Sequence, residues 1–217
     1  MAKANGRVRV GFSHPVVAKY DAGSGTPKYT EGRVLARGVG VKLAIKVVES
    51  NDFYADDMLA ESESGGFAGG TMTLTVDGMH TESEALILGL GEPEQVTYGS
   101  SQNVKVTKYG AAAQPPYVGV GYVTEYKSGD VSEWVPTIVR KAKFKQPGDE
   151  AKTRGENTDW LTQELEADIF RDDSETADWK WVGEAQSSRL AAWKVVDGLL
   201  NVAGAAAAAS YVGGKNG

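Results

Sequence analysis

Alternation of apolar and polar side chains with a period of two is the dominant pattern in this sequence. Between residues 39 and 47, every odd position holds valine, leucine or isoleucine, and the even positions hold glycine, alanine or lysine. Between residues 71 and 77, threonines alternate in the same way with Met72, Leu74 and Val76. Successive side chains of a strand point to opposite faces, so both segments predict half-buried β-strands.

Further strands are expected along the rest of the chain. Residues 7–12 and 161–171 alternate in the same way, and residues 179–182 predict a short last strand. Residues 117–127 and 135–145 predict a long hairpin, because the turn-forming residues Ser128, Gly129 and Asp130 lie between them. No crossover-sized helix separates these strands, so we expect antiparallel pairing. The predicted fold class is mainly β, an antiparallel β-sandwich or barrel with a flanking α-helix.

Two segments carry helix signals. In residues 81–90, Thr81 and Glu84 have the spacing of a capping box, and the helix is expected to end at Gly89 or Gly91. Residues 187–200 predict a second helix, because three large apolar residues recur at every third position, Leu190, Trp193 and Val196.

Three polar stretches are interpreted as loops: residues 21–32, 49–70 and 146–159. The second is unusually long for a compact domain, and long loops tend to be functional or disordered. Gly119 and Gly121 alternate within a predicted strand, which indicates bending or close approach of another backbone. The sequence has no internal repeat, so we expect one domain over residues 1–201, followed by an alanine- and glycine-rich tail over residues 202–217.

Composition narrows the functional classes. The 217 residues include no cysteine, which excludes disulfides, thiolate metal sites and cysteine nucleophiles. The chain has 23 basic and 29 acidic residues, a formal net charge of −6, and proteins that grip nucleic acid normally show a basic patch instead. An acidic surface repels DNA phosphates. No apolar stretch has the length of a signal peptide or a membrane span, so we expect a protein that stays inside the producing cell.

No constellation of residues points to catalysis, a metal or a cofactor, and we expect no enzyme. His14 and His80 lie far apart in the sequence and are interpreted as surface residues. Glu164, Glu166 and Asp168 share one face of a predicted strand, which a solvated or lumenal face explains more simply than an acid pair. The glycines of residues 65–70 lack the Gly-Lys-Ser/Thr ending of a phosphate loop.

Aromatic residues within the long loop suggest a contact surface. Phe53 and Tyr54 stand beside Asp56 and Asp57 in an otherwise polar segment. Aromatic residues are enriched in the cores of protein interfaces, so a subunit contact is one interpretation. Local packing under the loop is the other.

The order of these segments resembles that of the major tail tube proteins of long-tailed, siphovirus-type bacteriophages. The most specific piece is Asn-Asp-Phe-Tyr-Ala-Asp-Asp at residues 51–57, directly after a strand. The segments that carry the resemblance are residues 7–20, 39–57, 69–78, 81–91, 117–129, 134–147, 161–173 and 187–201. The alanine-rich tail departs from the family pattern.

The resemblance implies the phage tail-tube fold, a homo-hexameric ring, and head-to-tail stacking of rings into a tube. Double-stranded DNA would pass through the lumen without specific binding, and no membrane or cofactor would be involved. The implied partners are a tape measure protein and tail terminator and distal tail proteins, and the implied location is the virion tail, assembled in the host cytoplasm.

Two assignments follow from the resemblance and the pattern together. Residues 39–48, 71–77, 117–127 and 135–145 would form the inner sheet that lines the tube. Residues 49–70 would form an arm that reaches the neighbouring ring. The expected contact residues of this arm are Phe53, Tyr54, Asp56, Asp57, Met58 and Leu59.

Three other classes stay open beside the contractile-tail version: a capsid decoration protein, a carbohydrate-binding β-sandwich and an acid-pair glycosidase, which would lose its activity on substitution of one carboxylate. A capsid decoration protein would form trimers or monomers without filaments. A carbohydrate-binding β-sandwich needs exposed aromatic residues along one face, for which the candidates are Trp134, Trp160, Trp179, Trp181 and Trp193. The contractile-tail or secretion-tube version of the tail-tube fold is the nearest alternative.

Overall fold

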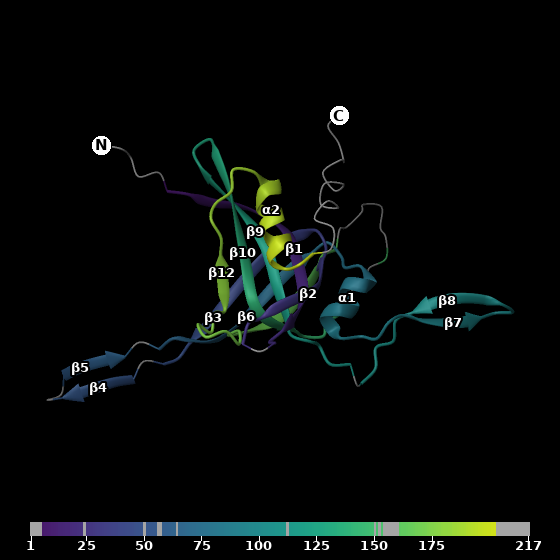
Figure 1. Ribbon diagram of the computed structural model, residues 1–217, viewed down its shortest axis with the longest axis horizontal. Coiled ribbons are helices and arrows are strands. Elements are labelled where there is room, and N and C mark those ends of the chain that lie inside the picture. Colours follow the sequence, from purple (N-terminus) through teal and green to yellow (C-terminus); the bar gives the residue numbers. More distant parts are fainter. Residues whose placement is uncertain are drawn as a thin grey trace.

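The structure is a computed structural model that describes residues 6–23, 25–49, 51–55, 58–63, 65–111, 113–149, 151, 153 and 161–202. It is mainly β, with two short helices (Figure 1). The elements in chain order are β1 (Val8–Asp21), β2 (Lys28–Val34), β3 (Gly38–Val47), β4 (Asn51–Ala55), β5 (Met58–Glu63), β6 (Phe67–Val76), α1 (Thr81–Leu88), β7 (Glu94–Tyr98), β8 (Gln102–Val106), β9 (Val118–Ser128), β10 (Val131–Phe144), β11 (Gln163–Phe170), β12 (Lys180–Val182) and α2 (Arg189–Leu199).

One antiparallel sheet forms the body, with the strand order β2-β1-β9-β10-β11-β6-β3 and with β12 added to β10. The strand β10 joins the two halves of this sheet. Its residues Thr137–Val139 pair with β12, and residues 141–144 pair with β11 along the same edge. The predicted antiparallel pairing and the predicted β9–β10 hairpin are therefore confirmed.

The sheet curls over a core that lies between its two halves. Leu165, Ala167 and Ile169 of β11 point into this core, and α1 closes part of it with Leu86, Ile87 and Leu88. The edge strand β3 approaches β1 at the other end of the sheet, because a Cβ atom added to Gly38 of β3 would lie 2.3 Å from the Phe12 ring of β1. The body therefore has the layered form that the alternating pattern predicts.

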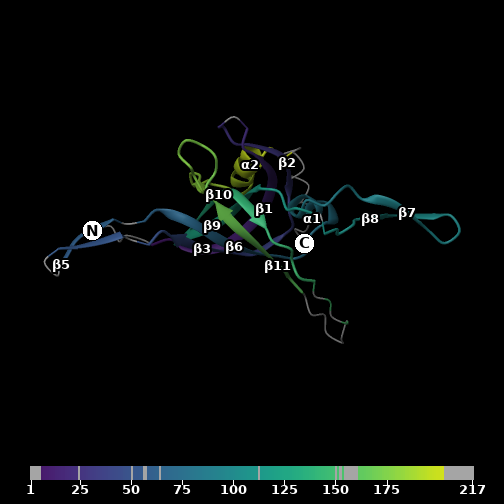
Figure 2. The ribbon, with the colours of Figure 1, turned by 90° about the horizontal axis from the view of Figure 1, so that it is seen from below.

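The helix α2 covers the outer face of β1, β9 and β10, so the body has three layers (Figure 2). A Cβ atom on Gly121 would lie 2.5 Å from Cγ1 of Val196, and one on Gly119 would lie 3.0 Å from Cδ2 of Leu200. The close neighbours of these glycines are side chains rather than the predicted second backbone, and the nearest one to Gly119 is the Tyr29 ring of β2, 2.4 Å from an added Cβ atom.

Both helices form where the sequence predicts them, but α1 begins differently. His80, not Thr81, is its N-cap and makes no side-chain capping hydrogen bond, so the predicted capping box is wrong. The helix ends at Gly89, which has φ = 64°, a conformation that glycine adopts without strain. In α2, the Ser188 hydroxyl accepts a hydrogen bond from the Ala191 amide at 3.2 Å and caps the first turn.

Five strands form outside the predicted set, and one extends beyond its predicted residues. β2 begins within the predicted loop 21–32 and runs to Val34, and β4 and β5 lie within the predicted loop 49–70. β7 and β8 were not predicted. β1 extends beyond the predicted residues 7–12 to Asp21, because a register shift between Ser13 and Val16 accommodates His14 and Pro15 in the strand.

The single-domain interpretation stays a prediction, since most of the tail lies outside the described residues. Val202, the last described residue, bridges to Gly32 of β2 and holds the chain beside the body at that point. Most of the predicted loop 146–159 also lies outside the described residues, and the part that is described, residues 146–149, 151 and 153, has no regular secondary structure.

Candidate functional site

The predicted arm, residues 49–70, is an antiparallel hairpin rather than an irregular loop. Among the described strands, β4 pairs only with β5, with Tyr54 opposite Leu59 and Ala55 opposite Met58. The hairpin continues the β3–β6 ribbon, because the Val48 amide donates to the Gly66 carbonyl at 2.9 Å. It projects well beyond the body at one end of the longest axis (Figure 1).

The backbone brings four of the six predicted contact residues, Phe53, Tyr54, Met58 and Leu59, onto this hairpin. The Met58 side chain is 71% exposed. Asp56 and Asp57 lie outside the described residues. The role of this segment as a subunit contact stays a prediction.

A second hairpin, β7–β8, projects from the opposite end of the longest axis, and sequence reasoning missed it (Figures 1 and 2). Val96 lies opposite Val104, and Tyr98 lies opposite Gln102 across a short turn. The sequence does carry a hairpin pattern here, because two short runs that alternate apolar and polar residues flank Gly99. Gly99 has φ = 61° in the turn. Its valines and Tyr98 are exposed.

The outer face of the β3–β6–β11 layer is polar and open. Lys42, Thr73 and Glu166 lie side by side across the three strands. The Lys145 ammonium lies 3.5 Å from Glu166 and 3.4 Å from Asp168, so acids and bases are interleaved on this face. The predicted outward orientation of the three acids of β11 is consistent with their alternation with buried residues.

The predicted lining strands need one correction. Residues Val118–Thr124 of β9 are buried on both faces, because the core covers one face and α2 covers the other. Residues 135–140 of β10 are buried as well. Neither stretch can face a lumen within this subunit, and β11 takes their place beside β6 and β3 in the open layer.

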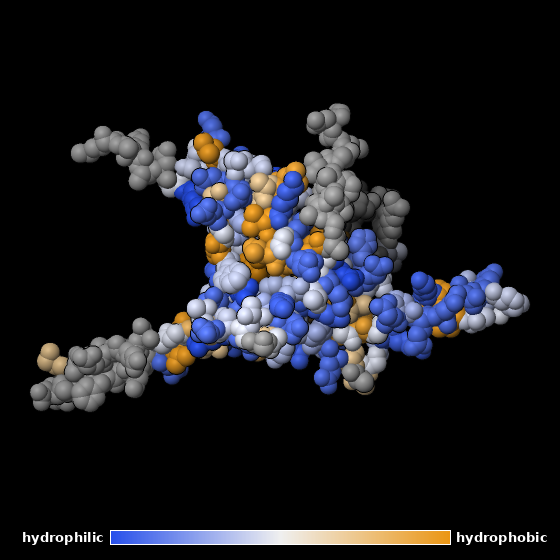
Figure 3. Space-filling model, in the orientation of Figure 1, coloured by the Kyte–Doolittle hydropathy of each residue, from blue (hydrophilic) through white to orange (hydrophobic). Residues whose placement is uncertain are grey.

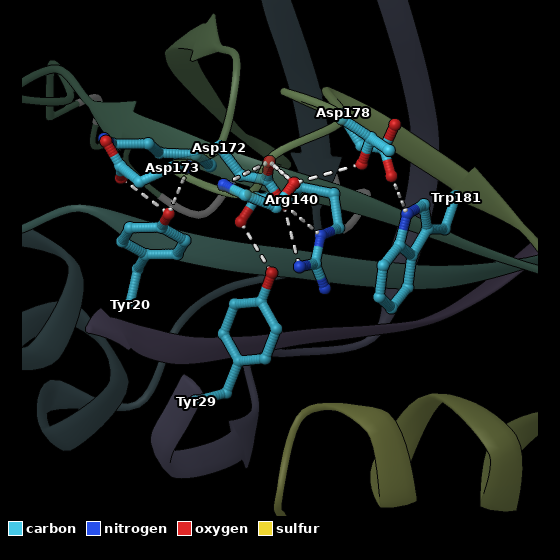
Figure 4. A network of polar contacts seen from close by, with 10 residues as sticks. Tyr20, Tyr29, Arg140, Asp172, Asp173, Asp178 and Trp181 are labelled. Carbon is cyan, nitrogen blue, oxygen red and sulfur yellow. Dashed lines mark hydrogen bonds and ion pairs between the residues drawn. The ribbon is translucent and has the colours of Figure 1, made fainter. Parts of the chain in front are cut away.

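A closed polar network fixes the segment between β11 and β12 against β10 (Figure 4). The Arg140 guanidinium donates to Asp172 from both Nε and Nη2 at 2.8 Å, and both side chains are almost completely buried. Arg140 also lies over the Trp181 ring, whose Nε1 donates to Asp178 at 2.8 Å. The pKa of Asp172 is lowered: burial opposes its ionisation, and the hydrogen bonds from Ser174 and Arg140 outweigh burial.

Tyr20 belongs to the exposed rim of the same network. Its hydroxyl donates to Asp173 at 2.6 Å, and the Lys141 ammonium donates to the same carboxylate oxygen. Burial first, and then the hydrogen bond to Asp173, raise the pKa of Tyr20 to about 12. These contacts are those of a structural clamp, since Tyr20, Arg140 and Trp181 each donate to an aspartate of the same segment.

The raised tyrosine pKa values predict a loss of stability in alkali. Burial also raises the pKa of Tyr122 to about 12, above the ordinary value of 10.0. A group whose pKa is raised on folding stabilises the fold below its unfolded pKa, so stability should fall as the pH rises from 10 to 12. Urea unfolding at several pH values, followed together with tyrosinate absorbance, measures this. Stability that stays constant over that interval would contradict the assignment.

His14, interpreted from sequence as a surface residue, is buried, so that interpretation is wrong. Its Nε2 lies 2.7 Å from Oδ1 of the buried Asp197, and its ring stacks on Trp193 with the centroids 4.6 Å apart. The backbone of His14 has φ = 58°, a conformation that residues other than glycine rarely adopt. This contact locks α2 onto β1.

Replacing His14 with alanine should destabilise the fold by about 1–3 kcal/mol, because the Asp197 carboxyl would stay buried without its partner. Urea unfolding followed by tryptophan fluorescence measures the change. His80→Ala, at an exposed position, is the matched control and should change stability by less than about 0.5 kcal/mol. Equal effects of the two substitutions would show that the buried contact contributes little.

The tryptophans do not form an exposed aromatic face among the described residues. Trp134 and Trp193 pack against the α2 cluster, and Trp179 stacks on Phe67. Trp181 is the exposed one of the four described tryptophans, and Arg140 covers its ring. Trp160 lies outside the described residues. This arrangement disfavours the carbohydrate-binding alternative.

The described residues thus define an antiparallel β body with one helix-covered face, one open polar face and two opposed hairpins. No known family model matches the chain, and no curated protein is a significant match to it. Within the described ranges, no group of three or more histidine or acidic side chains is placed to hold a metal ion. No helix of the described chain is long and apolar enough to cross a membrane.

Proposed function

We propose that this chain is the major tail tube subunit of a long-tailed bacteriophage, which stacks in hexameric rings to form the conduit for genome ejection. The observation that carries the proposal is the pair of hairpins that project from opposite ends of one antiparallel β body (Figure 1). Two projecting hairpins would let each subunit contact one copy at each of its two ends. The resemblance of the segment order to tail tube proteins supports the same function.

The edge strand β3 supports ring formation. Among the described residues it pairs on one side only, with β6, and it exposes Val39, Ile45 and Val47. Proteins normally protect an apolar edge strand, because its free backbone groups recruit other strands. Pairing with neighbouring subunits around a ring would remove this edge.

The open face of the β3–β6–β11 layer suits the lining of a DNA conduit. It carries threonines from β6 and interleaved acids and lysines, without a basic patch. Phosphate binding requires clustered basic side chains, so such a face lets double-stranded DNA pass without specific binding. In this proposal the lining strands are β3, β6, β11 and the end of β10.

The β4–β5 hairpin is proposed as the arm that reaches the next ring, with Phe53, Tyr54, Asp56, Asp57, Met58 and Leu59 in the contact. The further partners would be the tape measure protein inside the tube and the tail terminator and distal tail proteins at its ends. Assembly would take place in the host cytoplasm, and the protein would reside in the virion tail.

Negative-stain electron microscopy of the purified, concentrated chain at several salt concentrations tests the proposal. We expect hollow tubes with a regular axial repeat and six-fold end views. If the isolated chain gives small particles, co-expression with proteins that initiate a phage tail should convert them into tubes. Stable trimers that do not stack would contradict the proposal and favour a capsid decoration protein.

Deleting residues 52–64 should abolish tube formation and leave the body folded. The deletion removes the projecting β4–β5 hairpin, which pairs with no other strand of the described chain. Electron microscopy measures tubes, and circular dichroism with urea unfolding verifies that the sheet persists. Normal tubes from the shortened chain would show that this hairpin is not the inter-ring arm.

A further inference from the structure

The β7–β8 hairpin has one apolar and one polar face. Glu94 at its root and Gln102 at its tip lie on the apolar face. Between them, strand pairing places four large side chains that are all exposed: Val96, Tyr98, Val104 and Val106. The polar face carries Gln95, Thr97, Asn103 and Lys105. Figure 3 shows the apolar group as a patch on the projecting hairpin.

This apolar face lacks a covering layer. Within the described chain, β7 and β8 make substantial contacts only with each other. Isolated two-stranded hairpins are marginally stable in water, and packing against a further element usually stabilises them. Contiguous exposed apolar side chains on such an element mark an interaction site.

A second uncovered apolar face lies at the opposite end of the body, where the β3–β6 ribbon leaves the core. Ile45 and Val47 follow Leu43 at intervals of two, so they lie on the face of β3 that packs toward the core. They are nevertheless 39% and 67% exposed. Phe67 lies opposite Val47 and stacks on Trp179, with the ring centroids 4.8 Å apart. We call the side chains of Ile45, Val47, Phe67 and Trp179 the arm-base face, because the β4–β5 hairpin begins just beyond them.

The charged groups that border these two faces differ in sign. At the arm-base face, the Arg171 guanidinium donates to the Phe67 carbonyl, and the Lys180 ammonium lies 4.7 Å from the centroid of the Trp179 ring. Neither cation forms an ion pair with any residue that the structure describes. On the hairpin, Glu94 is the one charged side chain among the paired residues of the apolar face.

Glu94 can exchange its present partner at little cost. It pairs with Lys108 of its own chain, and the two side chains are 63% and 60% exposed. Exposed ion pairs contribute little to stability, so a cation of another molecule can replace Lys108. The cations of the arm-base face are less readily neutralised from within their own chain, because the adjacent Asp172 and Asp173 already pair with cations of β10.

We propose that the apolar face of the β7–β8 hairpin of one copy packs on the arm-base face of a second copy, with Glu94 toward Arg171 and Lys180. This inference rests on the proposed function and names the surfaces that join one ring to the next. The two faces lie at opposite ends of the longest axis, so the contact is head to tail and propagates from copy to copy (Figures 1 and 2). Each face contributes only four large side chains, against roughly 20–30 residues a side in a stable interface, so the contacts of a whole ring must act together.

A charge introduced at the centre of the contact should block assembly. Val104→Asp should raise the protein concentration needed for assembly at least about tenfold, because packing would bury an unpaired carboxylate. Adding Val47→Lys to the same chain should recover part of the loss, since opposite charges would then meet. Light scattering measures assembly, and circular dichroism verifies the fold.

Thr97→Asp is the matched control, because it adds the same charge to the polar face of the same hairpin. It should change the concentration needed for assembly by about twofold at most. Equal effects of Val104→Asp and Thr97→Asp would overturn the assignment of the apolar face to the contact.

Cysteine cross-linking tests the contact directly, because the chain has no native cysteine. A chain that carries both Val47→Cys and Val104→Cys should form a ladder of covalent oligomers on mild oxidation, which traps even a transient contact. The matched control combines Val104→Cys with Val131→Cys, since Val131 is 62% exposed but lies at the β9–β10 turn, and should give no ladder. Non-reducing gel electrophoresis at several protein concentrations provides the readout.

The outcomes separate this contact from the proposed function. Tubes without a ladder from the Val47→Cys/Val104→Cys chain would overturn the hairpin contact and leave the tail tube proposal standing. A ladder in oligomers that never become tubes would support the contact and count against the tail tube. Equal cross-linking of the test and control pairs, or no cross-linking at any concentration, would overturn the contact.

Discussion

Replacing Asp172 with alanine is expected to lower the free energy of unfolding by about 3–5 kcal/mol. The loss of stability arises because the substitution leaves the buried Arg140 guanidinium without its ion-pair partner. Its side chain is 4% exposed, and Asp172, its ion-pair partner, is completely buried. Without that carboxylate, the guanidinium stays in a low-dielectric environment with no opposite charge, and this penalty is much larger than the value of the pair itself.

The loss should extend along the segment that the pair fixes. Asp172 also accepts hydrogen bonds from the amide and hydroxyl of Ser174, and Arg140 lies over the Trp181 ring of β12. Release of these contacts should free β12 from β10, which amide hydrogen exchange can detect at Lys180–Val182.

Urea unfolding of Asp172→Ala measures the main effect, and Asp173→Ala is the matched control. Asp173 is the adjacent residue and also pairs with a cation, Lys141, but its side chain is 45% exposed. Exposed pairs contribute about 0–1 kcal/mol, so the control should change stability little. Equal losses in both variants would mean that burial of the Arg140 pair does not govern its energetics.

Replacing Gly121 with leucine should displace α2 from the sheet and destabilise the protein by about 1–3 kcal/mol or more. A Cβ atom added at this position would lie 2.5 Å from Val196 and 2.8 Å from Leu200, both on the buried face of the helix end. The sheet and the helix cannot both keep their positions, because protein interiors are close-packed.

Thermal unfolding and the fluorescence of Trp193, which lies on α2, measure this displacement. Gly198→Ala in the same helix is the control, since a Cβ atom there has no neighbour within 4 Å. Alanine favours helix over glycine by about 1 kcal/mol, so the control should stabilise the protein or leave it unchanged. A normal melting temperature for Gly121→Leu would show that the contact between α2 and β9 is loosely packed.

Much of the sheet could be predicted because its strands are half-buried. β6 and β11 alternate in sequence, since one face meets the core and the other meets solvent. β9 does not alternate in burial, because α2 covers the face that would otherwise be open. Sequence reasoning placed that strand correctly but assigned it a lumenal face, since the covering helix comes much later in the chain.

The candidate surfaces were predicted less completely. The aromatic residues of the acidic segment 49–70 indicated a contact. The sequence pattern did not show that this segment is a hairpin, in which Tyr54 lies opposite Leu59. The β7–β8 hairpin was missed because each of its two alternating runs carries only two apolar residues, Val96 and Tyr98 in one and Val104 and Val106 in the other. His14 was misplaced because its partner, Asp197, is 183 residues away, a contact that local patterns do not encode.

The position of β1 inside the sheet has a consequence for the order in which the molecule forms. β1 is synthesised before the other described strands, yet it lies between β2 and β9, and Arg9 meets Tyr126 across a separation of 117 residues. Closing so long a loop is slow, and translation proceeds at about 5–20 residues per second. The ribosome must therefore deliver more than half of the chain before β1 gains its second neighbour. Folding of the body is thus delayed until late in synthesis, which keeps unfinished chains from offering a complete sheet to one another.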